Sequence, residues 1–169
     1  MVTAVLDARS ARAVAEDVRD PELPVLTLGD LGIVRDVRVD GGRVTVALTP
    51  TYSGCPAITA MRADVARALR EAGADDVEVH AALEPAWSSD WITAAGRVKL
   101  AAAGIAPPLA APARTSGPVP LTLARPLAVT CPRCGSADTE QTAAFGPTAC
   151  TALLRCRDCG EPFEHVKAV

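Results

Sequence analysis

Two C-x-x-C pairs near the C-terminus limit what the end of this 169-residue chain can fold into. Cys131 and Cys134 form the first pair, Cys156 and Cys159 form the second, and 21 residues separate the pairs. The segment of about 43 residues that carries them is too short to bury a stable core by itself. Four thiolates at this spacing predict a tetrahedral metal site made of four cysteines. Zinc suits such a site because it adds no redox chemistry, and iron is the alternative metal.

Two further residues of this tail stand outside the ligand set. Cys150 lies six residues before Cys156, and we interpret it as a small buried hydrophobe rather than a fifth ligand. We interpret His165 as a solvated or half-packed residue. The tail is therefore expected to be a stabilising zinc ribbon without chemistry of its own.

Composition separates the tail from the rest of the chain. Residues 105–126 contain six of the 14 prolines and no acidic residue, which predicts a semi-extended linker. The sequence thus divides into a first domain over residues 1–104, a Pro/Ala-rich linker over 105–126 and a ribbon domain over 127–169.

The first domain combines strand-like and helix-like patterns. Alternating apolar residues over 33–39 and 43–49 predict two strands, and Asp40-Gly41-Gly42 between them predicts a hairpin turn. A third short strand is expected over residues 77–81. Helical spacing and capping residues predict helices over 11–18, from Pro56 to Gly73, and from Ser88 or Ser89 to about Ala103. These patterns indicate an α+β class, with helices packed on a small mixed sheet.

Charge and hydropathy exclude several function classes. The net charge of −3 gives no basic footprint for nucleic acid or for an anionic membrane surface. No uncharged apolar run reaches the length of roughly 18 residues that a bilayer span needs. The charged N-terminal segment does not resemble a signal peptide, so we expect a cytoplasmic protein with reduced cysteines.

Cys55 stands alone in TPTYSGCP, at the turn between a predicted strand and a predicted helix. The positive end of a helix lowers the pKa of a thiol placed there, which would make Cys55 a usable nucleophile or metal ligand. Alternatively, Cys55 simply fills a small space under the turn. The residues by themselves leave both interpretations open.

The elements of a catalytic centre are missing. His80 is the one histidine of the first domain, and we interpret it as a strand residue rather than as a base for Cys55. The sequence contains no G-x-G-x-x-G, P-loop, H-E-x-x-H or di-iron E-x-x-H motif. We therefore expect no enzyme. A metal bound by Cys55 would need further ligands from a second copy, a partner or a carboxylate such as Asp30.

Four segments carry a family resemblance, in this order: DPELPVLTLGDLGIV, TPTYSGCP, PAWSSDWITAAGRVKLAAAGIAPP and CPRCGS…CRDCGEPF. Together they resemble the D subunits of phenylacetyl-coenzyme A epoxidase over nearly the whole chain. The first domain also resembles the wider SufT-like family of iron–sulfur assembly factors.

This resemblance implies an accessory protein for a multicomponent bacterial di-iron oxygenase of phenylacetate catabolism. The implied role is to help insert or maintain iron or an iron–sulfur cluster, held transiently by Cys55. The implied partners are the oxygenase or reductase subunits, and a SufT-like domain would also allow a homodimer that pairs two Cys55 residues. Other family positions found here are Asp20, Glu22, Asp30, Thr49, Thr51, Trp87, Asp90 and Trp91.

Two functions stay open at this point. One is a maturation or carrier protein that uses Cys55, supported by Glu22, Asp30 and Thr51, with zinc confined to the ribbon. The other is a structural or regulatory subunit of the oxygenase complex, in which Cys55 only packs. An independent thiol enzyme or a nucleic-acid-binding ribbon is disfavoured by the missing base, the acidic charge and the few aromatic residues.

Overall fold

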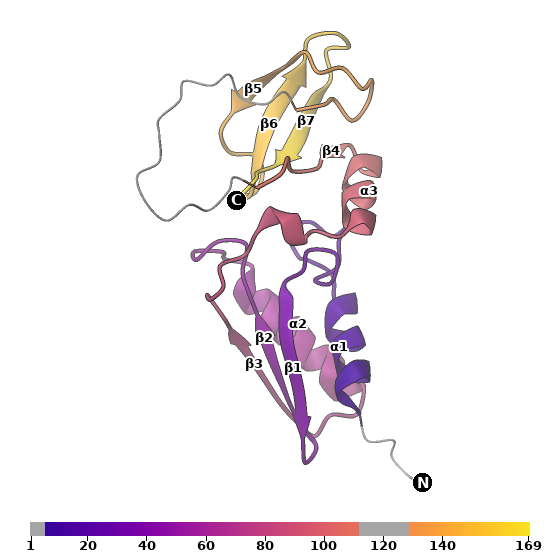
Figure 1. Cartoon of the computed structure of the whole chain (residues 1–169), viewed down its shortest axis with the longest axis vertical. Helices are drawn as coiled ribbons and strands as arrows, with labels where there is room; N and C mark the ends of the chain where they lie inside the picture. Colours follow the sequence, from indigo (N-terminus) through magenta and orange to yellow (C-terminus); the bar gives the residue numbers. More distant parts are fainter. Residues whose placement is uncertain (1–5, 112–128) are drawn as a thin grey trace. The chain divides into compact units, whose positions relative to one another are not determined.

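The computed structural model describes residues 6–111 and 129–169, which form two units (Figure 1). The first unit holds the described residues up to 87 together with 91–99. The second holds residues 88–90 and the described residues from 100 onward. Each unit contains one small sheet, and helices accompany the sheet of the first unit. The α+β class expected from the sequence is confirmed.

The first unit is built on a three-stranded mixed sheet. Strands β1 (Val34–Asp40) and β2 (Arg43–Leu48) form an antiparallel hairpin, and β3 (Asp76–Ala81) pairs with β2 in parallel. Gly41 and Gly42 make the predicted turn with φ values of 55° and 90°, which side-chain-bearing residues rarely adopt. Helix α2 (Ile58–Glu71) connects the parallel strands.

The register of the strands separates an apolar from a polar face. Val37, Val46 and Val79 are aligned across the sheet and are buried, whereas the aligned neighbours Arg38 and Glu78 are exposed. Helix α1 (Ala8–Asp17) packs on β1 and α2, and α2 packs on β3. The apolar stripe of α2 is fully buried and consists of Met61, Val65 and Leu69.

Two helices of the first unit start at other residues than expected. Helix α1 begins at Ala8, because the Asp7 carboxylate caps it by accepting a 2.7 Å hydrogen bond from the backbone N–H of Ser10. Helix α2 begins at Ile58 rather than at Pro56, after a turn in which the Cys55 N–H donates to the Tyr52 carbonyl.

The predicted helix from Ser88 or Ser89 to Ala103 is divided in two. A 3-10 turn, η1, covers Ser89–Trp91, and α3 covers Ala94–Ala102. Ser89 is fully buried, and both its backbone N–H and its hydroxyl hydrogen-bond to Val169. Thr93 caps α3 instead, because its hydroxyl accepts from the Gly96 N–H at 2.9 Å.

The second unit contains a four-stranded sheet in the order β4-β7-β6-β5. The strands are β4 (Ile105–Ala106), β5 (Thr139–Ala143), β6 (Thr151–Cys156) and β7 (Pro162–Val166). Ala106 belongs to the buried core of this unit, alongside Leu154 and Phe163. The predicted linker therefore begins with two residues that form a strand, and its residues 112–126 lie outside the described part.

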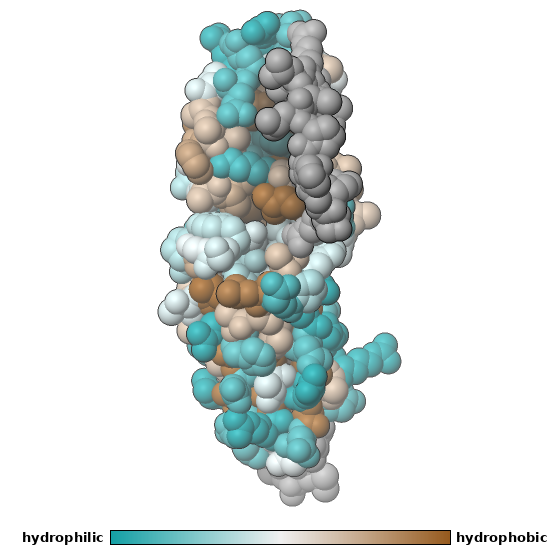
Figure 2. Space-filling model, turned by 60° about the vertical axis from the view of Figure 1, so that its left-hand side comes forward, coloured by the Kyte–Doolittle hydropathy of each residue, from teal (hydrophilic) through white to brown (hydrophobic). Residues whose placement is uncertain are grey.

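On the face drawn in Figure 2, hydrophobic residues lie mostly as separate spots among hydrophilic ones. Five large hydrophobic residues are exposed in the described part of the chain: Val25, Leu83, Val98, Phe145 and Val169. No helix of this part is both long and apolar enough to cross a bilayer.

Leu69→Ala is expected to lower the free energy of unfolding of the first unit by about 2–5 kcal/mol, because it leaves a cavity under the sheet. Denaturant titration followed by tryptophan fluorescence measures this, since both tryptophans, Trp87 and Trp91, belong to the first unit. The neighbouring exposed residue gives the control: Arg70→Ala should change stability by less than about 0.5 kcal/mol. Equal effects of the two substitutions would contradict the buried position of Leu69.

Candidate metal centre and the Cys55 site

The two C-x-x-C pairs form two similar backbone turns in the second unit. In each turn the N–H of a glycine donates to the carbonyl of the first cysteine at 3.0 Å, Gly135 to Cys131 and Gly160 to Cys156. Both glycines have positive φ values, 75° and 77°, which explains why glycine follows each pair. The second turn joins the end of β6 to β7.

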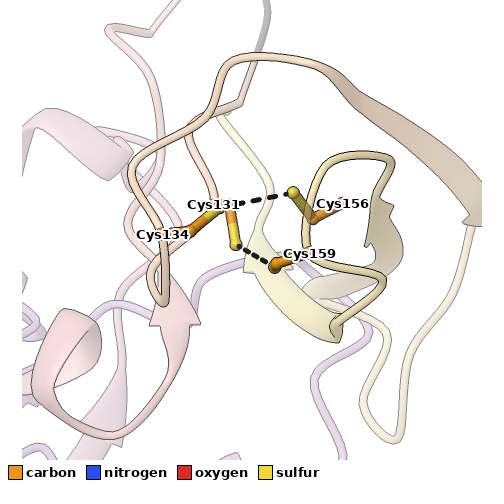
Figure 3. Close-up of side chains that lie close together, drawn as sticks. All are labelled: Cys131, Cys134, Cys156 and Cys159. Carbon is orange, nitrogen blue, oxygen red and sulfur yellow. Dashed lines mark hydrogen bonds between the residues drawn. The ribbon is translucent and has the colours of Figure 1, made fainter.

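The four cysteine side chains converge on one point (Figure 3). The sulfur atoms all lie within 4.8 Å of one another. The Cys131–Cys159 pair is 3.8 Å apart and the Cys134–Cys156 pair is 3.6 Å apart. A tetrahedron with metal–sulfur bonds of about 2.3 Å requires sulfur atoms about 3.8 Å apart. The donor set thus fits a zinc ion in both chemistry and size.

Without a metal, the four thiols share their protons unequally. The backbone N–H of Cys159 donates to the Cys156 sulfur and lowers the pKa of Cys156 to about 7. The Ser136 amide favours the thiolate of Cys134, but the neighbouring thiols of Cys159 and Cys156 raise the pKa of Cys134 to about 12. Because a bound dication replaces these protons, metal binding would release them to the solvent.

Charged side chains link the two cysteine turns. The Arg133 guanidinium in the first turn pairs with the Glu161 carboxylate after the second, and the Ser136 hydroxyl donates to the Asp158 carboxylate. Arg133 also lies in the field of the Cys159 and Cys131 sulfurs. A tetrathiolate bound to a dication carries two negative charges, which this arginine partly offsets. The sequence analysis missed Arg133. Its position between Cys131 and Cys134 in the first C-x-x-C pair could have indicated it.

Cys150 and His165 are not part of the four-sulfur cluster. The Cys150 sulfur lies 3.0 Å from the Thr148 hydroxyl oxygen. His165 is half-buried, its burial lowers its pKa, and its Nε2 atom has no partner among the described residues. His165 is half-packed as interpreted, whereas Cys150 is half-buried and hydrogen-bonded rather than the buried hydrophobe interpreted from the sequence.

Cys55 is buried in the first unit, with 5% of its surface exposed. Burial raises the pKa of the Cys55 thiol; the Ala57 and Ile58 backbone amides oppose this, whereas the Glu22 and Asp20 carboxylates add to it. This direction is opposite to the lowered pKa on which the first of the two sequence interpretations of Cys55 depended, and it favours the packing interpretation. Desolvation and two nearby carboxylates outweigh the amides at the start of α2.

Asp20 and Glu22 are brought to Cys55 from a segment more than 30 residues away in sequence. Asp20 is 4% exposed, and its Oδ1 atom accepts hydrogen bonds from the backbone N–H groups of Glu22 at 2.8 Å and Leu23 at 2.6 Å. Burial raises the pKa of Asp20, and burial together with Asp20 raises the pKa of Glu22. The Cys55 thiol and these two carboxylates therefore lie within electrostatic range of one another.

Thr49 directly follows β2 in the segment that leads to Cys55. It is 1% exposed, and its hydroxyl oxygen has no hydrogen-bond partner among the described residues. Thr51 is half-buried, and no described contact joins it to Cys55. Its predicted supporting role stays a prediction.

Asp30 is engaged elsewhere. Its carboxylate pairs with the Lys99 ammonium at 2.6 Å and accepts from the Thr27 N–H at 3.0 Å. Burial opposes these contacts, but together they hold the pKa of Asp30 below its usual range. The supporting role of Asp30 at Cys55 stays a prediction, whereas the Asp20 and Glu22 carboxylates are among the groups that raise the pKa of Cys55.

The tryptophan positions of the family resemblance have structural contacts. The Trp87 indole N–H donates to the Leu31 carbonyl at 2.8 Å, and the Arg35 guanidinium lies 3.8 Å from the Trp91 ring centroid. Asp90, in the second unit, accepts from the Ala111 N–H at 3.0 Å.

Cys156→Ser is expected to abolish retention of zinc and to unfold the ribbon, because metal-binding free energy in such small modules is folding free energy. Elemental analysis after dialysis against a chelator measures the zinc, and the dispersion of amide NMR signals from β5, β6 and β7 reports the fold. Cys150→Ser is the matched control and should keep both. Zinc retention by Cys156→Ser equal to that of the wild type would contradict the ligand assignment.

The double variant Asp20→Asn/Glu22→Gln is expected to lower the pKa of Cys55, since it removes two negative charges that favour the protonated thiol. The pH at which alkylation of Cys55 by iodoacetamide reaches half its maximal rate should then fall. Peptide-resolved mass spectrometry measures this rate separately from the other cysteines. Asp30→Asn serves as the control and should leave the midpoint of alkylation unchanged. An unchanged midpoint in the double variant would show that Asp20 and Glu22 do not influence the pKa of Cys55.

Comparison with known families agrees with the division into two units. The family model described as iron-sulfur cluster assembly protein matches residues 10–81, and that described as PaaD zinc beta ribbon domain matches residues 115–167. A crystal structure of a domain of unknown function, DUF59, from Bacillus anthracis is similar to 55% of this chain. It is matched over 90% of its own length with a TM-score of 0.51 and 28% identity.

Two curated proteins are similar to this chain in sequence. An Fe-S protein maturation auxiliary factor of Porphyromonas gingivalis (strain ATCC BAA-308 / W83) is 34% identical over 85 residues, which cover 49% of this chain and 80% of that protein. The D subunit of a putative 1,2-phenylacetyl-CoA epoxidase of Escherichia coli (strain K12) is 40% identical over 157 residues. That match covers 93% of this chain and 90% of the relative, and all four ribbon cysteines lie within the matched zinc ribbon domain. The chain therefore belongs to the family of phenylacetyl-CoA epoxidase D subunits, in which an iron–sulfur assembly-type domain precedes a zinc ribbon.

Proposed function

We propose that this protein is a non-catalytic accessory factor of a phenylacetyl-CoA epoxidase system in phenylacetate catabolism, acting in the cytoplasm. It holds iron or an iron–sulfur cluster transiently at Cys55 and passes it to a client subunit. The observation that carries this proposal is the buried Cys55 thiol within electrostatic range of the Asp20 and Glu22 carboxylates. This site lies in the segment that matches the iron–sulfur assembly family.

The chemistry of the Cys55 site suits a cargo that arrives and leaves. In the free protein the raised pKa keeps the thiol protonated at neutral pH. Binding of an iron species replaces that proton, which is released to the solvent, and the carboxylates of Asp20 and Glu22 stay ionised as further ligands. One thiolate and two carboxylates leave a cluster incompletely ligated, so the remaining ligands come from the client or from a second copy. Incomplete ligation favours release over permanent retention.

The zinc ribbon has a different task in this proposal. Its four thiolates would fill all four positions of a tetrahedral zinc ion, which is the ligand set of a structural metal rather than of a catalytic one. The ribbon stabilises the second unit and supplies a surface for an oxygenase or reductase subunit. The relative from Escherichia coli carries the name of an epoxidase subunit, which supports such a partner.

A structural or regulatory subunit is the second candidate function. The low exposure of Cys55 and its raised pKa favour it, because a buried, protonated thiol is also what a packing cysteine looks like. In this case the protein binds zinc alone and copurifies with the oxygenase at a fixed ratio.

The deciding measurement is the content of zinc, iron and acid-labile sulfide in protein purified without oxygen. Wild type is expected to hold one zinc per chain, set by the four-cysteine site, together with iron that is lost in Cys55→Ala. Cys150→Ala, the control for loss of a thiol outside both sites, should keep zinc and iron. Circular dichroism of each variant confirms that the fold survives.

Zinc alone in every variant, even after reconstitution with iron and sulfide, would overturn the carrier proposal. It would leave the structural subunit as the function.

A further inference from the structure

An open groove of about 860 Å³ lies at one end of the first unit. Three segments form it: the start of α1, the β1–β2 hairpin and the turn that follows α2. Figure 1 shows these three segments gathered at the same end of the sheet. The groove is well within the size range of ligand sites in proteins, and the Cys55 site does not contribute to it.

Polar and apolar surface line the groove in similar measure; the half-buried side chains of Leu6 and Val39 supply apolar surface, and the backbone is open at two glycines. Val44 and Ala74 form buried parts of the floor, with 1% and 7% of their surfaces exposed. Gly41 and Gly73 line it with φ values of 55° and 101°, and a Cβ atom added at either position would meet nothing within 4 Å. An apolar side chain can therefore approach the floor without displacing a side chain at these glycines.

The charged residues that line the groove are both acidic. They are Asp7 and Asp75, and no lysine or arginine lines it in the described part of the chain. The Ser10 amide holds the pKa of Asp7 below its usual range, so this carboxylate is charged at neutral pH. Asp40 and Asp76 flank the lining residues, and Asp76 is partly neutralised by Arg43 at 3.6 Å. Arg9 is close enough to Asp7 to lower its pKa but does not line the groove, so the lining favours cationic over anionic ligands.

We propose that this groove docks a protein partner through a segment in which an apolar side chain lies between lysine or arginine residues. The apolar part of the lining receives the side chain, and the carboxylates of Asp7 and Asp75 pair with the flanking cations. Helix α2 has 14 residues and starts just after Cys55, so the groove beyond its other end lies about 21 Å from the Cys55 turn. A partner held there leaves Cys55 uncovered.

The test uses the full chain labelled with 15N and two synthetic heptapeptides. One peptide alternates leucine with lysine, and the other alternates leucine with glutamate. We expect the lysine peptide to shift the amide signals of Gly41, Gly42 and Gly73 in a saturable way, with the glutamate peptide at least tenfold weaker. Raising the salt concentration should weaken binding of the lysine peptide, because salt screens the ion pairs.

Charge reversal locates the binding. Asp75→Lys should weaken binding of the lysine peptide by roughly tenfold and should tighten binding of the glutamate peptide. Asp17→Lys makes the same change of net charge at the far end of α1 and is the matched control, for which wild-type affinity is expected. Equal weakening by both variants, equal affinity for both peptides, or shifts confined to other residues would each overturn the proposal.

Two other occupants are distinguished by the same spectra. If a second copy of the chain fills the groove, the glycine signals move with protein concentration in the absence of peptide. If the first five residues of the chain fill it, the lysine peptide binds only to a variant that lacks them. Either result overturns the proposal of a separate partner. None of these outcomes depends on iron content, so this experiment tests the groove independently of the carrier function of Cys55.

Discussion

Packing of the α2 stripe under the mixed sheet is the interaction on which the first unit depends. Met61, Val65 and Leu69 are buried against a sheet whose central residue, Val46, is fully enclosed. Burial of each such side chain contributes about 1.5–3 kcal/mol. Because α2 joins two parallel strands, its two ends are held at opposite ends of the sheet. The Cys55 turn stands before one end and the acidic groove beyond the other.

Desolvation decides the chemistry of Cys55. The backbone amides at the start of α2 favour the thiolate of Cys55, whereas burial disfavours it. The effect of burial is larger, so the pKa of Cys55 is raised. Two carboxylates strengthen this outcome, since their negative charge also opposes ionisation of the thiol. The free protein therefore stores Cys55 in the protonated form. An incoming cation would relieve the repulsion between these groups, which couples metal uptake to proton release.

The second unit is organised around four sulfur atoms rather than around a large core. Its buried cluster is small, and two of the four metal ligands, Cys131 and Cys156, belong to it. The strand β4 adds Ala106 to the same cluster from the other side of the proline-rich segment. The folding unit of the ribbon thus includes residues on both sides of that segment. The exposed ion pair of Arg133 and Glu161 adds little to stability by itself but joins the two cysteine turns.

The sequence by itself determined the elements that follow from local chemistry. The two C-x-x-C pairs predicted the four-cysteine cluster, and the alternation around Gly41 and Gly42 predicted the hairpin. Both features depend on residues that are close together in the sequence. Tertiary structure alone decided which groups meet. It paired Asp30 with Lys99, added Ala106 to the core of the ribbon, and raised a pKa of Cys55 that the helix end alone would have lowered. The burial of a side chain and the charges around it depend on residues that are distant in the sequence, so a local sequence pattern does not reveal them.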